Sequence, residues 1–546
     1  MKEKIVEKSK VLGIVLIITF LISIPYLNFE DISAHDISYH TNRIIAISEE
    51  LKNGQFPILI HSNLLDGFGY ANPLFYPELF LYIPAILTVM GVNFLTSYKL
   101  FTIITTFFTL IFTYYSSNRI FKKKNISWIV TILYGTSFYR LTDIYTRGAI
   151  GEVLALVFLP LVLCGLYEII FGENKNWWLI CFGIFGLINS HILSFTMTVI
   201  LILVICLLNI GRILKDKKRL ITLIIAGVVS ILLILGFVLP YLEQSNSDKF
   251  NVDEKIYSGT FVKSYAVSLQ ELINNQFNKG DFYKGIGTIL LVLPIFILTN
   301  KSKENESIYM KQLFALGIIT LFMTTSLFPW EKVCTKFEFI TTIQFPYRLN
   351  IIITVLFSFV SGYTLCNIIE NKTELNKLVY IVLILFTLNL LSTVNINADD
   401  YTLDTITTFA PVGNGEYKPY GMIDTDKKVH NISTQEEIEF SRNSTKLEFD
   451  YTNSKDEMII HIPLAYYKGY VAYIESEDGT KTNLVLEEDP VTKNIIVKND
   501  EILNGKVTVE YKMTVIQKIG YSITIVTLIC LVSYIINDKV KIIKKK

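Results

Sequence analysis

The chain carries DISAHDISYHTNRI at residues 31–44, NGQFP at 53–57 and DGFGYANPLFYP at 66–77, a polar stretch that follows an apolar run from Val11 to Leu27. Further apolar runs long enough to cross a bilayer follow this stretch. Ionisable side chains beside a membrane boundary cost free energy and are usually retained for chemistry or binding. The arrangement predicts a membrane protein whose first loop is functional.

Three residues of this loop, Asp36, His40 and Arg43, are spaced four and three apart. On a helix they would share one face. A carboxylate, an imidazole and a guanidinium together suit a polar, phosphorylated ligand. A solvated, salt-bridged helix accounts equally well for the spacing, so both interpretations stay open.

The composition indicates a polytopic membrane protein with a separate water-exposed part. The 546 residues are 51% hydrophobic. Residues 401–510 carry 20 acidic and 11 basic side chains, whereas the whole chain has a net charge of +1, so the remainder is basic. Neither part has the composition of a nucleic-acid-binding protein. The six cysteines have no CxxC spacing and predict neither a disulfide framework nor a thiolate metal site.

The basic loops set the predicted topology, because short Lys/Arg-rich loops stay in the cytoplasm. RIFKKK (Arg119–Lys124) is cytoplasmic only if Leu79–Met90 does not cross, and this short run contains Pro84. The prediction is then about twelve spans with both termini inside: 11–27, 97–116, 126–140, 151–170, 176–190, 193–210, 220–240, 286–300, 312–328, 348–368, 377–394 and 518–537. The polar segments converge on the extracytoplasmic face of a plasma membrane.

Residues 395–515 follow a different pattern. Segments such as KLEFDYT (446–452) and KVTVEYK (506–512) alternate apolar and polar residues between turn signals. This pattern is typical of antiparallel strands and predicts a small extracytoplasmic β-sandwich-like domain. We expect a transmembrane core at 1–394 with its first outer loop at 28–96, the β domain at 395–515, and a last helix with a basic tail at 516–546.

Other candidate binding residues lie where predicted spans reach the same face. In TDIYTRGAIGE, Arg147 and Glu152 are five apart, and the planar fork of arginine suits phosphate. Pairing of the two residues with each other is the alternative. His191 in NSHILS is either a satisfied helix-end residue or part of a site. Gln344 and Arg348 in QFPYR are either ligands or interfacial anchors.

The chain lacks a Walker loop, GxGxxG, HExxH or GxSxG element in a suitable context. An enzyme on the outer face would have no cytosolic nucleotide available. It would need an activated substrate delivered in the membrane, and a polyprenyl-phosphate-linked sugar meets this requirement.

The ordered set DISYHTNRI, NGQFP, GFGYANPLFYP, YRLTDIYTRGAIGEVLALVFLPLVL, SH and QFPYR resembles bacterial membrane proteins of the YfhO-like and PTPS-related type in the GT-C superfamily of glycosyltransferases. IPLAYYKGYVAY (Ile462–Tyr473) resembles the outer-domain motif of the YfhO type. YfhO-type members are longer, which leaves the acceptor open. Relatives labelled as pterin-synthase-related give no guide here, because the chain has no pterin-type zinc site.

The resemblance implies a GT-C-like helical core and sugar transfer to a cell-envelope glycan or teichoic-acid-like acceptor. An acidic residue of the first loop would act as the base, at Asp36 or, less well matched, Asp31. His40 would orient Asp36, and Glu152 would orient Arg147. The leaving phosphate would be held by Arg147 and Arg348, with Arg43 or His191 as further candidates. Gln344 belongs to the same substrate-binding set.

No cofactor is required by the spacing, although Asp36, His40 and Glu152 have donor atoms suited to Mg²⁺ or Mn²⁺. Two other functions compete with the transferase. A lipid-linked glycan flippase would need ionisable residues deep in the spans, where few occur. A non-catalytic envelope assembly protein would bind glycans or partners through its β domain.

Overall fold

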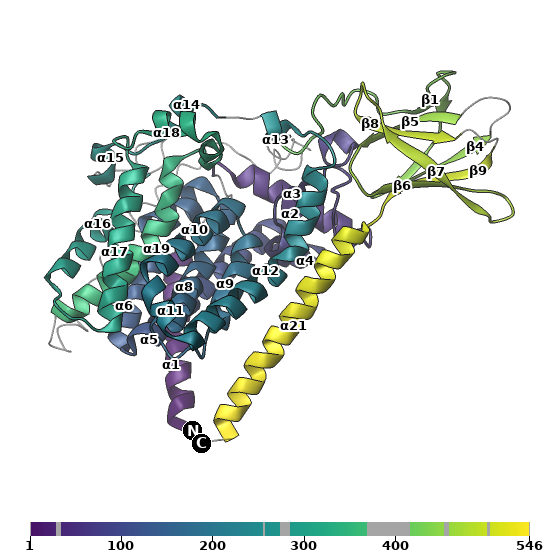
Figure 1. The fold of residues 1–546 in the computed structure, drawn as a ribbon. Coiled ribbons are helices and arrows are strands. Elements are labelled where there is room, and N and C mark those ends of the chain that lie inside the picture. The colour runs from purple at the N-terminus through teal and green to yellow at the C-terminus, as the bar shows by residue number, and fades with distance from the viewer. Residues whose placement is uncertain are drawn as a thin grey trace. The chain divides into compact units, whose positions relative to one another are not determined.

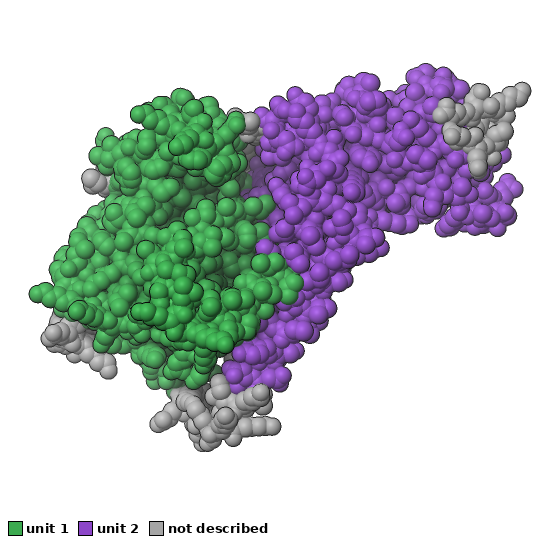
Figure 2. Space-filling model, in the orientation of Figure 1, with its two compact units in different colours: residues 1–37, 95–233, 256–401 green, residues 38–94, 234–255, 402–546 purple. Residues whose placement is uncertain are grey.

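The computed structural model describes residues 2–28, 34–254, 257–273, 284–368, 415–452, 458–499 and 503–544. The chain forms two compact units (Figure 2). Unit 1 comprises residues 1–37, 95–233 and 256–401, and unit 2 comprises residues 38–94, 234–255 and 402–546.

Seven helical segments in the described residues are long and apolar enough to cross a membrane, which supports a membrane location by length and composition. They belong to α1 (Lys2–Asn28), α5 (Phe94–Phe121), α8 (Ile150–Ile170), α12 (Lys217–Ser245), α17 (Asn305–Thr324), η6 with α19 (Pro346–Leu349, Asn350–Ile368) and α21 (Val515–Lys544).

The remaining predicted spans are shorter or lie outside the described residues. The predicted spans at 176–190, 193–210 and 286–300 correspond to shorter apolar helices at Trp178–Ile188, Ile192–Leu208 and Thr288–Thr299. The span expected at 126–140 is a 12-residue helix, α6 (Lys124–Gly135), followed by the short α7 (Phe138–Thr142). The span expected at 377–394 falls outside the described residues. A count of twelve is therefore not confirmed.

The stretch predicted not to cross forms η2 (Leu79–Leu81) and α4 (Tyr82–Val89). Eight helical residues span only about 12 Å, well short of a ~30 Å hydrocarbon core. That this stretch does not cross stays a prediction, which its short length favours.

Short helices complete the helical part (Figure 1). They are α2 (Ile37–Lys52), η1 (Leu65–Gly67), α3 (Asn72–Phe75), η3 (Asp143–Arg147), α9 (Trp178–Ile188), α10 (Ile192–Leu208), α11 (Ile210–Lys215), α13 (Asn251–Glu254), α14 (Gly259–Ser264), α15 (Leu269–Ile273), α16 (Thr288–Val292), η4 (Leu293–Thr299), α18 (Trp330–Lys336) and η5 (Glu338–Ile343).

The core of unit 1 is built around α8, which is buried along nearly its whole length and packs closely on α9. A Cβ at Gly165 would lie 2.5 Å from the backbone nitrogen of Ile180, and one at Gly186 would meet the ring of Phe158. Glycines therefore allow the two helices to approach, as small residues do between membrane helices. This packing fixes the start of α8, where the candidate site lies.

The described residues of unit 2 form nine antiparallel strands in the order β2-β1-β5-β8-β7-β6-β9-β4-β3. They are β1 (Val429–Asn431), β2 (Glu437–Ile438), β3 (Ser441–Asn443), β4 (Lys446–Thr452), β5 (Met458–Ala465), β6 (Tyr470–Glu475), β7 (Lys481–Glu488), β8 (Asn494–Asn499) and β9 (Asn504–Tyr511). Residues 481–484 of β7 pair with β6, and residues 485–488 pair with β8.

The antiparallel strands are confirmed, but a sandwich of two separate sheets is corrected to one continuous sheet, because β7 pairs on both sides. Apolar side chains from both halves of this sheet share one core, for example Ile460 and Val507. Residues of the first loop, including Tyr70 and Phe75, belong to the same core. Burial against the strands therefore holds that loop in place.

Candidate functional site

A wide helical turn places the candidate base. The five residues of η3 form a π-turn, a distortion frequent at functional sites, and it ends at Gly148 with φ +63°. A Cβ at Gly148 would lie 2.9 Å from Cβ of Ala34, so glycine lets the incoming chain pass close. The backbone N–H groups of His35 and Asp36 then donate to Thr146 O (3.2 Å) and Arg147 O (2.7 Å). Asp36 is thereby fixed beside Arg147.

Arg147 and Glu152 form a buried bidentate pair. NH2 of Arg147 donates to Oε1 of Glu152 at 2.9 Å, and NH1 donates to Oε2 at 3.1 Å. NH1 also pairs with Oδ1 of Asp143 at 2.5 Å. The hydroxyl of Tyr139 donates to Oε2 of Glu152. The guanidinium of Arg147 is thus held by two carboxylates.

Arg348 reaches the same glutamate from another part of unit 1. Its Nε lies 3.3 Å from Oε1 of Glu152 as an ion pair, but without hydrogen-bond geometry. Its NH1 donates to Oε1 of Gln344 at 2.6 Å. Gln344 has φ +59°, a strained conformation for a residue with a side chain, immediately before the span. Arg348 is 12% exposed, against 4% for Arg147, so it is the more accessible arginine.

His191 completes the group from the residue before α10. It is buried, and its Nδ1 forms a 2.8 Å hydrogen bond with Oγ of Ser194. Burial lowers the pKa of His191 to about 4, although Glu152 opposes this, so the ring is neutral at pH 7. We call Asp36, Asp143, Arg147, Glu152, His191, Gln344 and Arg348 the Glu152 cluster.

Burial favours the neutral form of two carboxyls in the Glu152 cluster, Asp143 and Asp36. Burial raises the pKa of Asp143 well above its usual value, and Glu152 adds to this, while Arg147 opposes it. Burial also raises the pKa of Asp36, although Arg147 and Arg348 act in the opposite direction. Oδ2 of Asp143 has no hydrogen-bond partner among the described residues. The cluster therefore has a hydrogen-bonding atom, Oδ2 of Asp143, that the other described residues do not pair.

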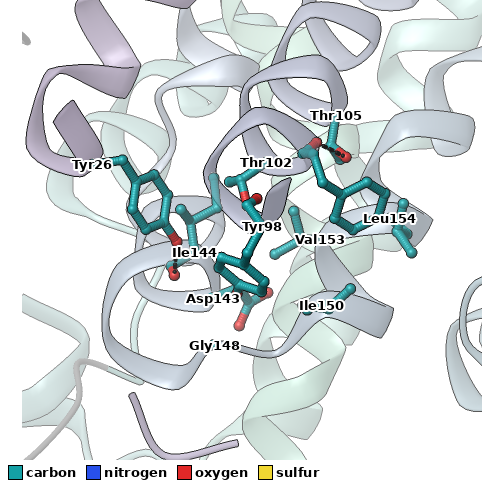
Figure 3. Close-up of a pocket in the computed structure, with 11 residues that line it drawn as sticks. Tyr26, Tyr98, Thr102, Thr105, Asp143, Ile144, Gly148, Ile150, Val153 and Leu154 are labelled. Atoms are coloured by element: carbon teal, nitrogen blue, oxygen red, sulfur yellow. Dashed lines mark hydrogen bonds between the residues drawn. The ribbon is translucent and has the colours of Figure 1, made fainter. Parts of the chain in front are cut away.

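A small cavity adjoins this cluster. Asp143 and Gly148 line it with Tyr26, Tyr98 and Thr102 (Figure 3). Its volume of about 10 Å³ is roughly enough for one water molecule. The cavity is therefore too small for a sugar or a lipid, and a substrate has to meet the cluster elsewhere.

The other two candidate residues of the first loop, His40 and Arg43, belong to a different cluster, in unit 2. Arg43 donates from Nε to Oε1 of Glu78 (2.8 Å), from NH2 to the carbonyl of Pro77 (2.7 Å) and from NH1 to Nδ1 of His40 (3.3 Å). Nε2 of His61 lies 3.0 Å from Oε2 of Glu78.

Asn72 also donates to Glu78, at 2.7 Å. We call His40, Arg43, His61, Asn72 and Glu78 the Glu78 cluster. Burial opposes the charge of Glu78, but His61 and Arg43 outweigh it and lower the pKa of this carboxyl to about 2. Because the guanidinium of Arg43 faces Nδ1 of His40, that nitrogen is a poor ligand for the Mg²⁺ or Mn²⁺ ion considered above.

A family model described as a family of unknown function, DUF6541, matches residues 9–337, which is more than half of the chain. The chain belongs to the DUF6541 family. The matched range includes Asp36, Arg147, Glu152 and His191, whereas Gln344 and Arg348 lie beyond it.

An uncharacterized protein of Lactococcus lactis subsp. cremoris (strain MG1363) is 26% identical over 335 residues, or 58% of this chain. The chain spans about half of that relative's length, since the aligned part is 54% of it. The DUF6541 description names no activity, so the function has to be argued from the site.

The predicted candidates divide into two groups. Asp36, Arg147, Glu152, His191, Gln344 and Arg348 lie in the Glu152 cluster, and His40 and Arg43 lie in the Glu78 cluster. Asp31 falls outside the described residues. Sequence reasoning missed Asp143, whose signal is its position four residues before Arg147, and Tyr139, for which no local signal exists.

Proposed function

We propose that this DUF6541 chain is a membrane glycosyltransferase of GT-C type, which moves a sugar from a polyprenyl-phosphate donor to a cell-envelope hydroxyl on the outer face. The comparisons name DUF6541 and no GT-C family, so this proposal rests on the residues. The observation that carries it is the pairing of two arginines with one buried glutamate, beside a carboxyl whose pKa is raised.

The position of the cluster supports a lipid-linked substrate. Glu152 lies in the first turn of a long apolar helix, and Arg348 lies at the start of another. A phosphate attached to a polyprenyl chain sits at the boundary between apolar and polar surroundings. The charged groups at these helix starts are therefore suitably placed to meet the phosphate while apolar helix surface meets the lipid.

Arg348 is the better candidate for the phosphate. Its Nε has no hydrogen-bond partner among the residues that the structure describes and its side chain is 12% exposed, whereas Arg147 is occupied by Glu152 and Asp143. In the transition state negative charge grows on the leaving phosphate, and a fixed guanidinium stabilises that charge. Arg147 then acts as a positioning residue that holds Glu152, which in turn orients Arg348.

Asp36 acts as the base. It would remove the proton of the acceptor hydroxyl while that oxygen attacks the anomeric carbon and the bond to the polyprenyl phosphate breaks, with inversion. A raised pKa brings a carboxyl closer to the operating pH and improves it as a base. His191, neutral at pH 7, would donate or accept a hydrogen bond with no charge of its own. Whether Mg²⁺ or Mn²⁺ takes part in the transfer is untested.

Purified protein in liposomes, supplied with a panel of polyprenyl-phosphate sugars and envelope acceptors, tests the proposal. Transfer to an acceptor that depends on Asp36 supports it. Movement of the donor across the bilayer without transfer would instead indicate a flippase. Neither activity, together with binding of envelope glycan, would indicate an assembly protein. Mass spectrometry of envelope polymers with and without the gene would identify the acceptor class.

A further inference from the structure

Two histidines and an aspartate meet on the face of the sheet in unit 2 that lies opposite the apolar core. His430 of β1 and His461 of β5 are direct partners across the antiparallel ladder. Their neighbours Val429 and Ile460 point into the apolar core, so the histidines point to the opposite face. Asp426 precedes β1 by three residues, in the segment that leads into it.

The three side chains are close enough to share one ion. One ligand atom from each lies within 4.8 Å of the others. Nδ1 of His430 is 3.6 Å from Oδ2 of Asp426, and the two imidazole rings stack with centroids 4.8 Å apart. Ligand atoms around a tetrahedral zinc ion are ~3.3 Å apart, given bonds of about 2.0–2.1 Å. The first pair is already near that spacing.

We propose that Asp426, His430 and His461 bind a divalent ion of the zinc type, with at least one coordination position left open. Two imidazoles and one carboxylate form a donor set that suits Zn²⁺ and Co²⁺ better than Mg²⁺ or Ca²⁺, which prefer oxygen ligands. This site is separate from the Glu152 cluster and does not depend on the proposed transferase activity.

The surroundings of His461 prepare it as a ligand. Its Nδ1 lies 3.1 Å from the carbonyl of Lys428, so Nδ1–H donates there and Nε2 keeps the lone pair. Nε2 accepts a 3.2 Å hydrogen bond from Nδ2 of Asn494, and an ion would replace that contact.

The side-chain amide of Asn494 can release its hydrogen bond to His461 at a small cost. Its Oδ1 is buried and has no hydrogen-bond partner among the described residues, so the amide is incompletely satisfied where it stands. An ion at this position would fasten the segment containing Asp426 to β1 and β5.

The test uses the full-length protein in detergent, stripped with EDTA and then titrated with Co²⁺ and with Zn²⁺. We expect one equivalent per chain, with Co²⁺ giving the intense visible absorption of a tetrahedral site and Zn²⁺ abolishing that absorption by competition. His430→Gln and Asp426→Asn should each weaken binding about 10-fold to 100-fold or more, since even outer-shell changes cost that much. Both positions are partly exposed, so these variants should fold.

His35→Gln and Asp478→Asn are the matched controls, because both residues are exposed and neither belongs to the proposed ligand set. They should keep the affinity of the wild-type protein. Failure of the wild-type protein to bind Co²⁺ or Zn²⁺ at micromolar concentration would overturn the site. So would unchanged affinity in the folded His430→Gln protein, checked by its melting temperature.

Discussion

The Glu152 cluster and the Glu78 cluster are both buried and both pair arginine with glutamate, but they differ in how fully their polar atoms are used. In the Glu78 cluster all three guanidinium nitrogens of Arg43 and both oxygens of Glu78 have partners, and Arg43 also lies over the rings of Tyr39 and Tyr76. The exception in this cluster is Nδ1 of His61, which has no hydrogen-bond partner within the part of the chain that the structure describes.

In the Glu152 cluster, by contrast, some polar atoms have no hydrogen-bond partner. Oδ2 of Asp143 and Nε of Arg348 lack hydrogen bonds among the described residues, and the pKa values of Asp143 and Asp36 are raised. Burial of unsatisfied polar groups costs free energy and persists chiefly where function needs it. We infer that the Glu78 cluster, in which Arg43 and Glu78 are fully hydrogen-bonded, stabilises the fold (the saturated cluster). The Glu152 cluster keeps polar atoms without partners among the described residues, which suits it to a ligand (the unsaturated cluster).

The largest expected effect tests the unsaturated cluster. Asp36→Asn keeps the shape but removes the base, so sugar transfer should fall by about 10²–10⁴-fold. Donor affinity should change little, because the phosphate is assigned to arginine. The measurement is in vitro transfer alongside donor binding. Asp66→Asn, at an exposed position, is the control and should keep full turnover. Full turnover in Asp36→Asn would remove Asp36 from the mechanism.

The second effect tests the saturated cluster through stability. Glu78→Gln leaves the buried charge of Arg43 without its carboxylate, and breaking a buried pair costs about 3–5 kcal/mol. The melting temperature of the protein in detergent should fall markedly. Glu173→Gln breaks an exposed pair with Lys175 and should change stability by less than about 1 kcal/mol. Equal melting temperatures for the two variants would contradict a structural role for Glu78.

Arg348→Lys gives a smaller effect on turnover. Lysine keeps the charge but loses the planar fork that reaches Gln344 and Glu152 together, so we expect about a tenfold loss, or ~1.4 kcal/mol of transition-state stabilisation. Stability should change less than in Glu78→Gln. Arg219→Lys, which alters a pair with Asp216 near the start of α12, is the control. An Arg348→Lys protein that loses stability but keeps full turnover would show that Arg348, like Arg43, has a structural role.

The smallest effect is a pH dependence at His191. Its folded pKa is about 4, against an ordinary value near 6.5, so between these pH values the unfolded chain binds more protons than the folded one. Stability should therefore fall as pH falls through this window. His191→Gln should flatten that part of the melting-temperature profile, and exposed His35→Gln should not. Identical profiles for His191→Gln and wild type would show that His191 is not buried as a neutral ring.

Local sequence patterns predicted part of the candidate site. The spacing of Arg147 and Glu152, five residues apart, left their pairing as one of two interpretations. The structure shows that they pair, through two hydrogen bonds. The same kind of reasoning placed Asp36, His40 and Arg43 on one helical face. However, α2 begins at Ile37, so Asp36 precedes the helix and is fixed by the backbone of Arg147 instead. A periodicity does not locate the end of a helix.

The sequence by itself determined the elements whose signal is periodic. Long apolar runs predicted the seven long helices, because a span needs about 20 apolar residues in succession. Alternation predicted β4 to β9, because successive side chains of a strand face opposite sides. β1, β2 and β3 are two or three residues long and carry too little alternation to be recognised.

Only the tertiary structure decided which distant residues meet. Arg348 and His191 reach Glu152 because the starts of their helices pack in one bundle, and His430 meets His461 because β1 pairs with β5 in a single register. Such contacts join positions far apart in the chain, so no local period encodes them. The packing of side chains between helices and the register of strands select them, and both depend on the whole fold.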